Sequence, residues 1–361
     1  MKHVELEDKV LYEDLCWCVE KILPMTELYG TTVFVTGGTG LIGSLFIKTL
    51  LLANNLHNTN IQVIAGVRSK EKACSVFKDF LPNNNLLIKE VDLCSEIVIE
   101  EDLDYVLHTA SITSSKYFIS NPAETLDLAY IGTRNVLELA RKKKVRSAVY
   151  LSSMEVYGRN DNEKEKVEEE DLGYIDILSV RSSYSEGKRI AECLCACYHK
   201  EYHVPIKIAR LAQTFGAGIG KSENRVFAQF ARSVISGKDI VLHTSGESWG
   251  NYCYTRDCLY GLIILLLKGK SGQSYNLTNE KSCISIKNMA ELVAGKFGNG
   301  KSKVIFDIPN DSMTYGYAPE THVHLSAEKM NELGWCAEID LEEAYQRMIS
   351  SLIIAEKQKE I

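Results

Sequence analysis

The sequence has no apolar run long enough to cross a membrane. The longest candidate, Leu259 to Leu267, stops at Lys268, whereas a membrane-spanning helix needs roughly 20 apolar residues. The first 20 residues also differ from a signal peptide, because acidic side chains such as Glu5 and Asp14 interrupt their apolar residues. We therefore expect a cytoplasmic protein with no membrane partner.

An excess of positive charge is also missing. Lys and Arg together number 41 against 48 Asp and Glu, which gives a net charge of -7. Proteins that bind nucleic acids rely on a basic face that neutralises phosphates. The composition therefore argues against a nucleic-acid partner.

The cysteines lack the paired spacing of metal ligands. None of the 11 cysteines forms a C-x-x-C pair, and a chain of this size does not need disulfides to hold its core together. The densest group, Cys193, Cys195 and Cys197, falls in a helical pattern, where residues two apart point to different faces. We expect these three to be small core side chains and the protein to hold no metal.

Strand-like and helical segments alternate through the first two thirds of the chain. The strand pattern occurs at 32–36, 61–67, 86–91, 105–108, 147–152 and 206–211, and the helical pattern at 44–53, 70–80, 121–142 and 184–202. Such alternation predicts an α/β fold with a doubly wound parallel sheet. After Leu211 the alternation loosens into glycine-rich loops, short strands and helices, which indicates a smaller C-terminal lobe.

A glycine-rich turn joins the first strand to the first helix of this pattern. In such a turn Gly37 permits the tight bend, Gly40 lets a pyrophosphate approach the backbone, and Gly43 allows close helix packing. The amides at the helix N-terminus then bind the anion. The context predicts a Rossmann-like dinucleotide site, with a plain glycine-rich turn as the alternative.

These patterns together suggest how the chain divides. We expect a helical extension over 1–30, a dinucleotide-binding domain over 31–212 and a mainly substrate-binding lobe over 213–361. At 361 residues, two lobes are the first expectation for a globular chain. The helix at 257–267 is expected to pack back on the first domain.

The end of the second strand bears on the choice of nicotinamide cofactor. An NAD site usually places an acidic residue there to hold the ribose 2′-hydroxyl, but this chain continues into Arg68 and Ser69. A guanidinium suits a 2′-phosphate, so NADP(H) is favoured over NAD(H). The alternative is that Arg68 is only a solvated loop residue. Asp92 and Leu93, after the third strand, are expected near the adenine.

Tyr184 and Lys188 lie one helical turn apart and can share a face of their helix. A phenol is a poor base at neutral pH, and an adjacent ammonium lowers its pKa by stabilising phenolate. Taken alone, the pair could be surface decoration. The hydroxyls at the end of the strand 147–152, some thirty residues earlier in the same chain, favour a proton-transfer set instead.

With these motifs the chain resembles the extended short-chain dehydrogenase/reductase family, in particular its nucleotide-sugar epimerases, dehydratases and decarboxylases. The resemblance covers about residues 31–340. It is carried by the segments 36–43, 108–111, 132–135, 153–158, 184–188, 210–216 and 254–257.

The resemblance implies a role for each matched residue. Ser153 falls on the Ser/Thr that hydrogen-bonds the reacting oxygen, Tyr184 on the acid/base and Lys188 on its partner. Glu155 falls on a carboxylate that the dehydratases and decarboxylases have. Simple epimerases lack this carboxylate. The expected cofactor contacts are Gly37, Thr39, Gly40, Leu41, Ile42, Gly43, Arg68, Ser69, Asp92, Leu93, Ala110, Ser111, Tyr184 and Lys188. The expected substrate contacts are Thr113, Ser114, Ser115, Gln213 and Arg225.

The chain departs from the family pattern at two positions that matter for the reaction. Met154 stands where many 4,6-dehydratases have the Asp that protonates the leaving hydroxyl, and a thioether cannot donate a proton. Gly250 stands where the family commonly has an Arg that clamps the sugar nucleotide's diphosphate. Loss of water by the usual route is therefore doubtful, and the substrate must be held differently.

An NADP-type loop fits an enzyme that takes a fresh hydride each turnover. The sequence alone therefore favours an NADPH-dependent reductase of a keto group on a nucleotide-linked sugar or sugar alcohol, feeding surface-polysaccharide synthesis. The first alternative is a redox-neutral dehydratase, decarboxylase or epimerase, which Glu155 supports. The second is a non-catalytic dinucleotide-binding regulator, against which the intact Ser153, Tyr184 and Lys188 argue. The resemblance and the two long helices at 121–142 and 184–202 also suggest a homodimer.

Overall fold

A parallel sheet of seven strands forms the centre of the computed structural model, which describes residues 4–160, 165–220, 223–308 and 320–357. The strand order is β11-β6-β5-β4-β1-β2-β3, and every neighbouring pair is parallel. The strands are β1 (Thr32–Thr36), β2 (Gln62–Val67), β3 (Leu86–Glu90), β4 (Tyr105–His108), β5 (Ser147–Ser153), β6 (Ile206–Leu211) and β11 (Ser274–Leu277). This Rossmann-like arrangement confirms the predicted fold class.

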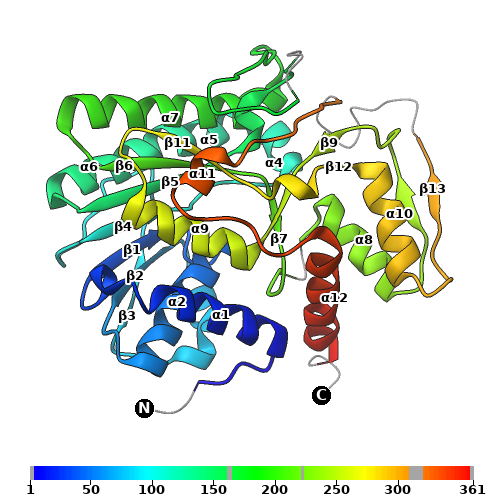
Figure 1. The fold of residues 1–361 in the computed structure, drawn as a ribbon. Coiled ribbons are helices and arrows are strands. Elements are labelled where there is room, and N and C mark those ends of the chain that lie inside the picture. Colours follow the sequence, from blue (N-terminus) through cyan, green and yellow to red (C-terminus); the bar gives the residue numbers. More distant parts are fainter. Residues whose placement is uncertain (1–3, 161–164, 221–222, 309–319, 358–361) are drawn as a thin grey trace.

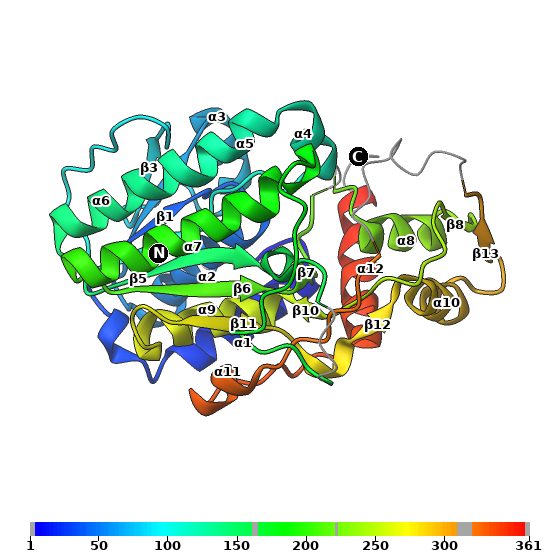
Figure 2. The ribbon, with the colours of Figure 1, turned by 90° about the horizontal axis from the view of Figure 1, so that it is seen from above.

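Helices cover both faces of the sheet (Figures 1 and 2). One face packs against α2 (Leu41–His57), α3 (Lys70–Val76) and α9 (Thr255–Lys268). The other packs against α6 (Thr133–Lys143) and α7 (Ser183–Tyr202). Because both faces are covered, the strands read as continuous apolar runs, and Val33 to Val35 are fully buried.

The N-terminal helix α1 (Lys9–Ile22) packs on α2 and α9 (Figure 1). Its first turn is capped by Asp8, whose side chain accepts a hydrogen bond from the amide of Leu11 at 3.0 Å. On its inner side the buried Asp14 accepts a hydrogen bond from the Tyr254 hydroxyl at 2.5 Å and one from Arg347 at 3.2 Å. Arg347 lies on the C-terminal helix α12 (Leu341–Lys357), so this hydrogen bond connects the N-terminal helix with the C-terminal helix.

A second apolar cluster lies beside the sheet, among α8 (Val226–Ile235), α10 (Ile286–Phe297) and α12 (Figure 2). This half of the chain also contains three two-stranded sheets. They are β7 (Gln213–Phe215) with β10 (Tyr252–Tyr254), β8 (Ile240–Leu242) with β13 (Val304–Phe306), and β9 (Trp249–Gly250) with β12 (Ile284–Ser285). The short helix α11 (Glu328–Glu332) follows β13 in the chain.

Three local expectations need correction. The helix expected at 121–142 consists of α5 (Pro122–Asp127), a π-helical turn (Leu128–Gly132) and α6. The helix expected at 70–80 ends at Val76 and continues as a 3-10 turn. Of the three clustered cysteines only Cys195 is a core residue, whereas Cys193 and Cys197 are exposed, because residues two apart on α7 face different sides.

Candidate active site

The glycine turn after β1 has no room for side chains. Gly37 has a φ of +66°, and a Cβ atom there would lie 2.8 Å from the backbone of Ala110. A Cβ atom on Gly43 would lie 2.5 Å from the carbonyl oxygen of Gly37. Gly40 precedes the first turn of α2, whose amides are capped by no side chain of the described residues. The turn therefore forms a backbone cradle that fits a pyrophosphate.

β2 lies next to β1 and β3 next to β2, so the residues that follow these strands lie at the same edge of the sheet as the glycine turn. Arg68 is exposed, while Ser69 accepts a hydrogen bond from the amide of Lys72 at 3.1 Å and so caps α3. Glu90, which the sequence analysis did not single out, accepts a hydrogen bond from the amide of Lys70 at 3.1 Å. An acidic group therefore does lie near the end of β2, but it comes from β3.

The predicted adenine residues stabilise their own turn. The Asp92 carboxylate accepts hydrogen bonds from the amide of Cys94 at 3.0 Å and from the Ser95 hydroxyl at 2.8 Å. These bonds, the one from Ser95 first, lower the pKa of Asp92. Leu93 is buried, and its carbonyl accepts a hydrogen bond from Asn135 at 2.8 Å.

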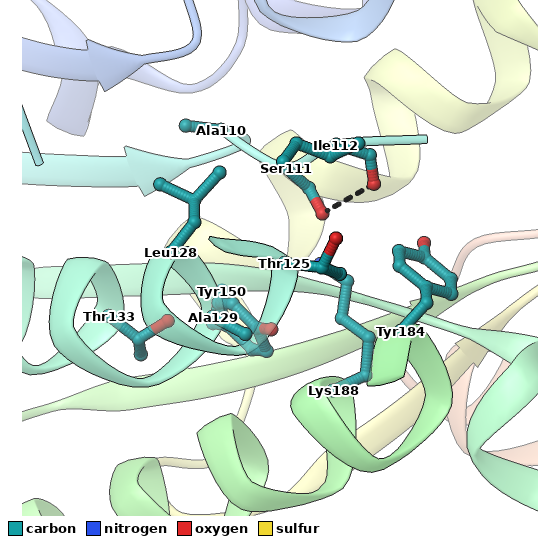
Figure 3. A pocket seen from close by; sticks show the side chains of 10 residues that line it. All are labelled: Ala110, Ser111, Ile112, Thr125, Leu128, Ala129, Thr133, Tyr150, Tyr184 and Lys188. Carbon is teal, nitrogen blue, oxygen red and sulfur yellow. Dashed lines mark hydrogen bonds between the residues drawn. The ribbon is translucent and has the colours of Figure 1, made fainter. Parts of the chain in front are cut away.

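A small cavity of about 10 Å³ lies among the segment that follows β4, the π-helical turn with its neighbouring helices, and α7, with Tyr150 of β5 in its lining (Figure 3). Its lining includes four residues predicted from the sequence, namely Ala110, Ser111, Tyr184 and Lys188. It also includes Ile112, Thr125, Leu128, Ala129, Thr133 and Tyr150, which the sequence analysis missed. Thr133 lies within a matched family segment, so that motif could have pointed to it. In Figure 3, Tyr184 and Lys188 extend from α7 toward this cavity.

Lys188 is buried at the base of the cavity. Its ammonium donates a hydrogen bond to the carbonyl of Leu151 at 2.7 Å and lies 4.8 Å from the centre of the Tyr150 ring. Burial lowers the pKa of Lys188 to about 8. The carbonyl of Leu151 and the ring of Tyr150 therefore hold the ammonium in place.

The pKa of Tyr184 moves in the direction opposite to the one expected. Burial raises the pKa of Tyr184 to about 12, and the charge of Glu155 contributes to this rise, whereas a hydrogen bond with Ser153 lowers it. The Lys188 ammonium lies 5.8 Å from the centre of the phenol ring. Burial thus outweighs the nearby charges in this structure, and the lowering of the Tyr184 pKa by Lys188 stays a prediction.

Glu155 lies beside the predicted proton-transfer set. Ser153 ends β5, and its hydroxyl accepts a hydrogen bond from the amide of Glu155 at 3.2 Å. The Glu155 carboxylate accepts hydrogen bonds from Arg181 at 2.9 and 3.1 Å and from the Ser185 hydroxyl at 3.2 Å. The 3-10 turn (Val180–Ser182) and α7 therefore hold this carboxylate, and its charge raises the pKa of Tyr184.

The predicted substrate residues lie on different elements around the carboxyl edge of the sheet. Thr113 and Ser114 are exposed and lead into α4 (Ser115–Ser120). Gln213 lies in β7, and its backbone amide donates a hydrogen bond to the backbone carbonyl of Asn251 at 3.1 Å. Arg225 pairs with Glu223 at 2.8 Å, and its charge also lowers the pKa of Tyr184. Arg225 therefore acts electrostatically on Tyr184, a member of the predicted proton-transfer set.

His108 lies between the end of β1, just before the glycine turn, and the cavity. Its Nδ1 lies 2.7 Å from the Thr36 hydroxyl, and its Nε2 lies 3.3 Å from the Thr133 hydroxyl. Burial lowers the pKa of His108 to about 3, so the ring is neutral at physiological pH. The ring therefore links Thr36, at the end of β1, to Thr133, which lines the cavity.

Within the described residues, no group of three or more His, Cys, Asp or Glu side chains could hold a metal ion. In the same part of the chain, no helix is long and apolar enough to cross a membrane.

Known proteins with similar sequences act on nucleotide sugars. UDP-glucuronic acid decarboxylase 1 from Xenopus tropicalis is 30% identical over 268 residues, which are 74% of this chain and 61% of that protein. UDP-glucuronic acid decarboxylase 3 from Arabidopsis thaliana is 26% identical over 317 residues, or 88% of this chain and 87% of the relative. The match to the Xenopus protein thus spans less than two thirds of its length.

Solved structures share the fold. UDP-glucose 4-epimerase from Thermotoga maritima, solved with UDP-glucose, is 21% identical in sequence, with a TM-score of 0.75. The match covers 90% of this chain and 99% of the epimerase chain. UDP-glucuronic acid 4-epimerase from Bacillus cereus, in complex with UDP-glucuronic acid and NAD, is 20% identical with a TM-score of 0.72, at 90% and 99% coverage.

The sequence model of the NAD-dependent epimerase/dehydratase family matches residues 33–278. This range runs from β1 to the end of β11 and includes the glycine cradle, Ser153, Tyr184 and Lys188. It confirms the resemblance drawn from the motifs and supports a nicotinamide dinucleotide as the cofactor. The chain therefore belongs to the NAD-dependent epimerase/dehydratase family.

Proposed function

We propose that this enzyme catalyses a redox-neutral reaction on a nucleotide-linked sugar, specifically the decarboxylation of a nucleotide-linked uronic acid. The observation that carries the proposal is the Glu155 carboxylate, which Arg181 and Ser185 hold within electrostatic reach of Tyr184. Reduction of a ketone needs a proton donor and a hydrogen bond to the carbonyl oxygen, but no carboxylate. A reaction that also moves a proton at a sugar carbon has a use for one.

The chemistry of a uronic acid fits these residues. Oxidation at C4 produces a β-keto acid, whose carboxylate leaves as CO₂ because the C4 carbonyl accepts the electron pair. A proton then adds at C5, and the carbonyl is reduced again. The nicotinamide, when bound, supplies the acceptor and the donor of the C4 hydride.

The protein's own groups would handle the protons. Tyr184 would remove the proton of the C4 hydroxyl and later return it, while Ser153 holds the C4 oxygen. Lys188, held by the carbonyl of Leu151, would bind the nicotinamide ribose. Glu155 would relay the proton that adds at C5.

Other members of the redox-neutral class fit these residues less well. A 4,6-dehydratase needs an acid for the leaving hydroxyl, and Met154 cannot supply a proton. By the family resemblance a simple epimerase does not need Glu155. The similar decarboxylases from Xenopus tropicalis and Arabidopsis thaliana also favour decarboxylation.

A net NADPH-dependent reductase is the second candidate, and Arg68 favours it. The guanidinium follows β2, where an NAD site usually has an acidic residue. We keep the preference for NADP(H) as a separate proposal, because a redox-neutral enzyme can also hold the phosphorylated cofactor.

The identity of the product tests the proposal. The purified enzyme is incubated with UDP-glucuronic acid and, in parallel, with UDP-glucose, and each product is identified by mass spectrometry. We expect UDP-glucuronic acid to lose CO₂ and Tyr184→Phe to slow this reaction about 100- to 10,000-fold, the scale of general acid/base catalysis. A wild-type enzyme that releases no CO₂ from UDP-glucuronic acid would contradict the proposal.

A further inference from the structure

A buried arginine joins the two side chains to which the proposed function assigns proton transfer. Arg181 lies in the 3-10 turn (Val180–Ser182) just before α7, and its side chain is 10% exposed. One guanidinium nitrogen, Nη2, donates to both carboxylate oxygens of Glu155, at 3.1 and 2.9 Å. Such charge-assisted hydrogen bonds fix a carboxylate in orientation as well as in charge.

The same guanidinium also contacts the aromatic partner of Tyr184. Its central carbon lies 4.9 Å from the centre of the Phe118 ring. Phe118, on α4, is fully buried and stacks on the Tyr184 ring with 4.4 Å between ring centres and 11° between planes. Arg181 is therefore linked to Glu155 by hydrogen bonds and to Tyr184 through one ring.

We propose that Arg181 is a positioning residue that holds Glu155 and, through Phe118, Tyr184 in one fixed unit. No motif of the resemblance includes it. The inference rests on the proposed function only in taking Tyr184 and Glu155 as the proton-transfer groups. It holds for decarboxylation and for any other reaction that begins with oxidation of a sugar hydroxyl by this set.

The charges around Tyr184 predict the direction in which the pH dependence of the rate shifts when Arg181 is replaced. Tyr184 faces Glu155, which raises its pKa, and Arg181 and Arg225, which lower it, with Lys188 on its own helix. Removing Arg181 takes away a cation and leaves the Glu155 carboxylate without its partner. If Tyr184 acts as the base, the alkaline rise in rate must then move to higher pH. Removing the charge of Glu155 must move it to lower pH.

The test is the pH dependence of the oxidation step, followed by the nicotinamide absorbance in single turnovers on whichever nucleotide sugar the enzyme converts. In Arg181→Met we expect the rise in rate to shift to higher pH and the rate at pH 8 to fall about 10- to 100-fold. Arg181→Lys should restore the pH profile but only part of the rate, because an ammonium cannot replace the planar guanidinium. Glu155→Gln should shift the profile in the opposite direction.

Two comparisons separate positioning from general damage. Arg146→Gln removes another ion pair, Arg146 with Asp104 at 2.9 Å, at the start of β5 and away from the site. It should leave rate and profile unchanged. In the Glu155→Gln background, Arg181→Met should lower the rate of the oxidation step by a smaller factor than it does in the wild type, since the two residues are coupled.

An unshifted pH profile in Arg181→Met would overturn the inference, as would equal losses of rate with and without the Glu155 charge. Circular dichroism and thermal unfolding identify a variant that fails to fold. If Arg181→Met fails to fold, the rate of Arg181→Lys decides, and a rate equal to that of the wild type contradicts the role of the planar guanidinium. Product mass is recorded in the same reactions. An unexpected product contradicts the proposed decarboxylation, whereas an unshifted profile contradicts only the role of Arg181.

Discussion

The Cε methyl group of Met154 lies 3.3 Å from the position that a Cβ atom would occupy on Gly250. The two residues at which this chain departs from the family pattern are therefore neighbours in space. Met154 follows β5, and Gly250 lies in β9. A thioether thus covers the point from which the family's diphosphate-binding arginine would extend.

This contact predicts that an arginine can be restored only together with space for it. Gly250→Arg alone has to displace Met154, whereas Gly250→Arg with Met154→Ala leaves room for the guanidinium. We expect the double variant to bind UDP about 10-fold more tightly than Met154→Ala, on the scale of one charge-assisted hydrogen bond. Isothermal titration calorimetry measures this. An equal gain in the single Gly250→Arg variant would show that Met154 does not block the position.

The proposed preference for NADP(H) over NAD(H) rests on Arg68. Arg68→Ala should weaken NADPH binding about 10- to 100-fold and leave NADH binding little changed, because only the 2′-phosphate uses the guanidinium. Lys70→Ala, a change of another exposed cation two residues further on, is the matched control and should have a smaller effect. Fluorescence titration of both cofactors gives the dissociation constants. Equal losses for NADPH and NADH would exclude the preference.

The buried Asp14 predicts a pH dependence of stability. Burial raises the pKa of Asp14 to about 6 from its ordinary value of 3.8, despite the hydrogen bond from Tyr254. Between these two pH values the folded state binds more protons than the unfolded state, so this group lowers stability as the pH rises.

Asp14→Asn should remove that part of the pH dependence. We expect the free energy of unfolding of the wild type to fall between pH 4.5 and 7 by about 1 to 3 kcal/mol relative to the variant, other groups being common to both. Urea unfolding at the two pH values measures this difference. Parallel curves for the two proteins would mean that Asp14 is ionised throughout.

Three exposed apolar residues support the predicted homodimer. Leu126, Tyr130 and Ile190 are 40 to 44% exposed and lie on α5, the π-helical turn and α7. α5 and α7 contact each other, so a second copy could cover both elements. We expect a dimer mass by light scattering at micromolar concentration and a monomer for Leu126→Asp with Ile190→Asp. Val98→Asp, at another exposed apolar residue, should stay dimeric. A monomeric wild type would refute the prediction.

The sequence predicted the sheet because parallel strands covered on both faces leave continuous apolar runs. It predicted Tyr184 and Lys188 because four residues make one helical turn. The pair of Glu155 with Arg181 left no such signal, since 26 residues separate them and only the fold brings them together. The raised pKa of Tyr184 also could not be predicted from the sequence, because it depends on how deeply the fold buries the phenol.

The ratio of product to cofactor tests the central claim most directly. A redox-neutral enzyme returns the hydride to the sugar, so a fixed, small amount of cofactor should support many turnovers of UDP-glucuronic acid. Product is quantified by chromatography while the nicotinamide absorbance is recorded. We predict product in large excess over cofactor with no sustained change in absorbance. Consumption of one NADPH for each molecule of product would contradict the account and establish the net reductase instead.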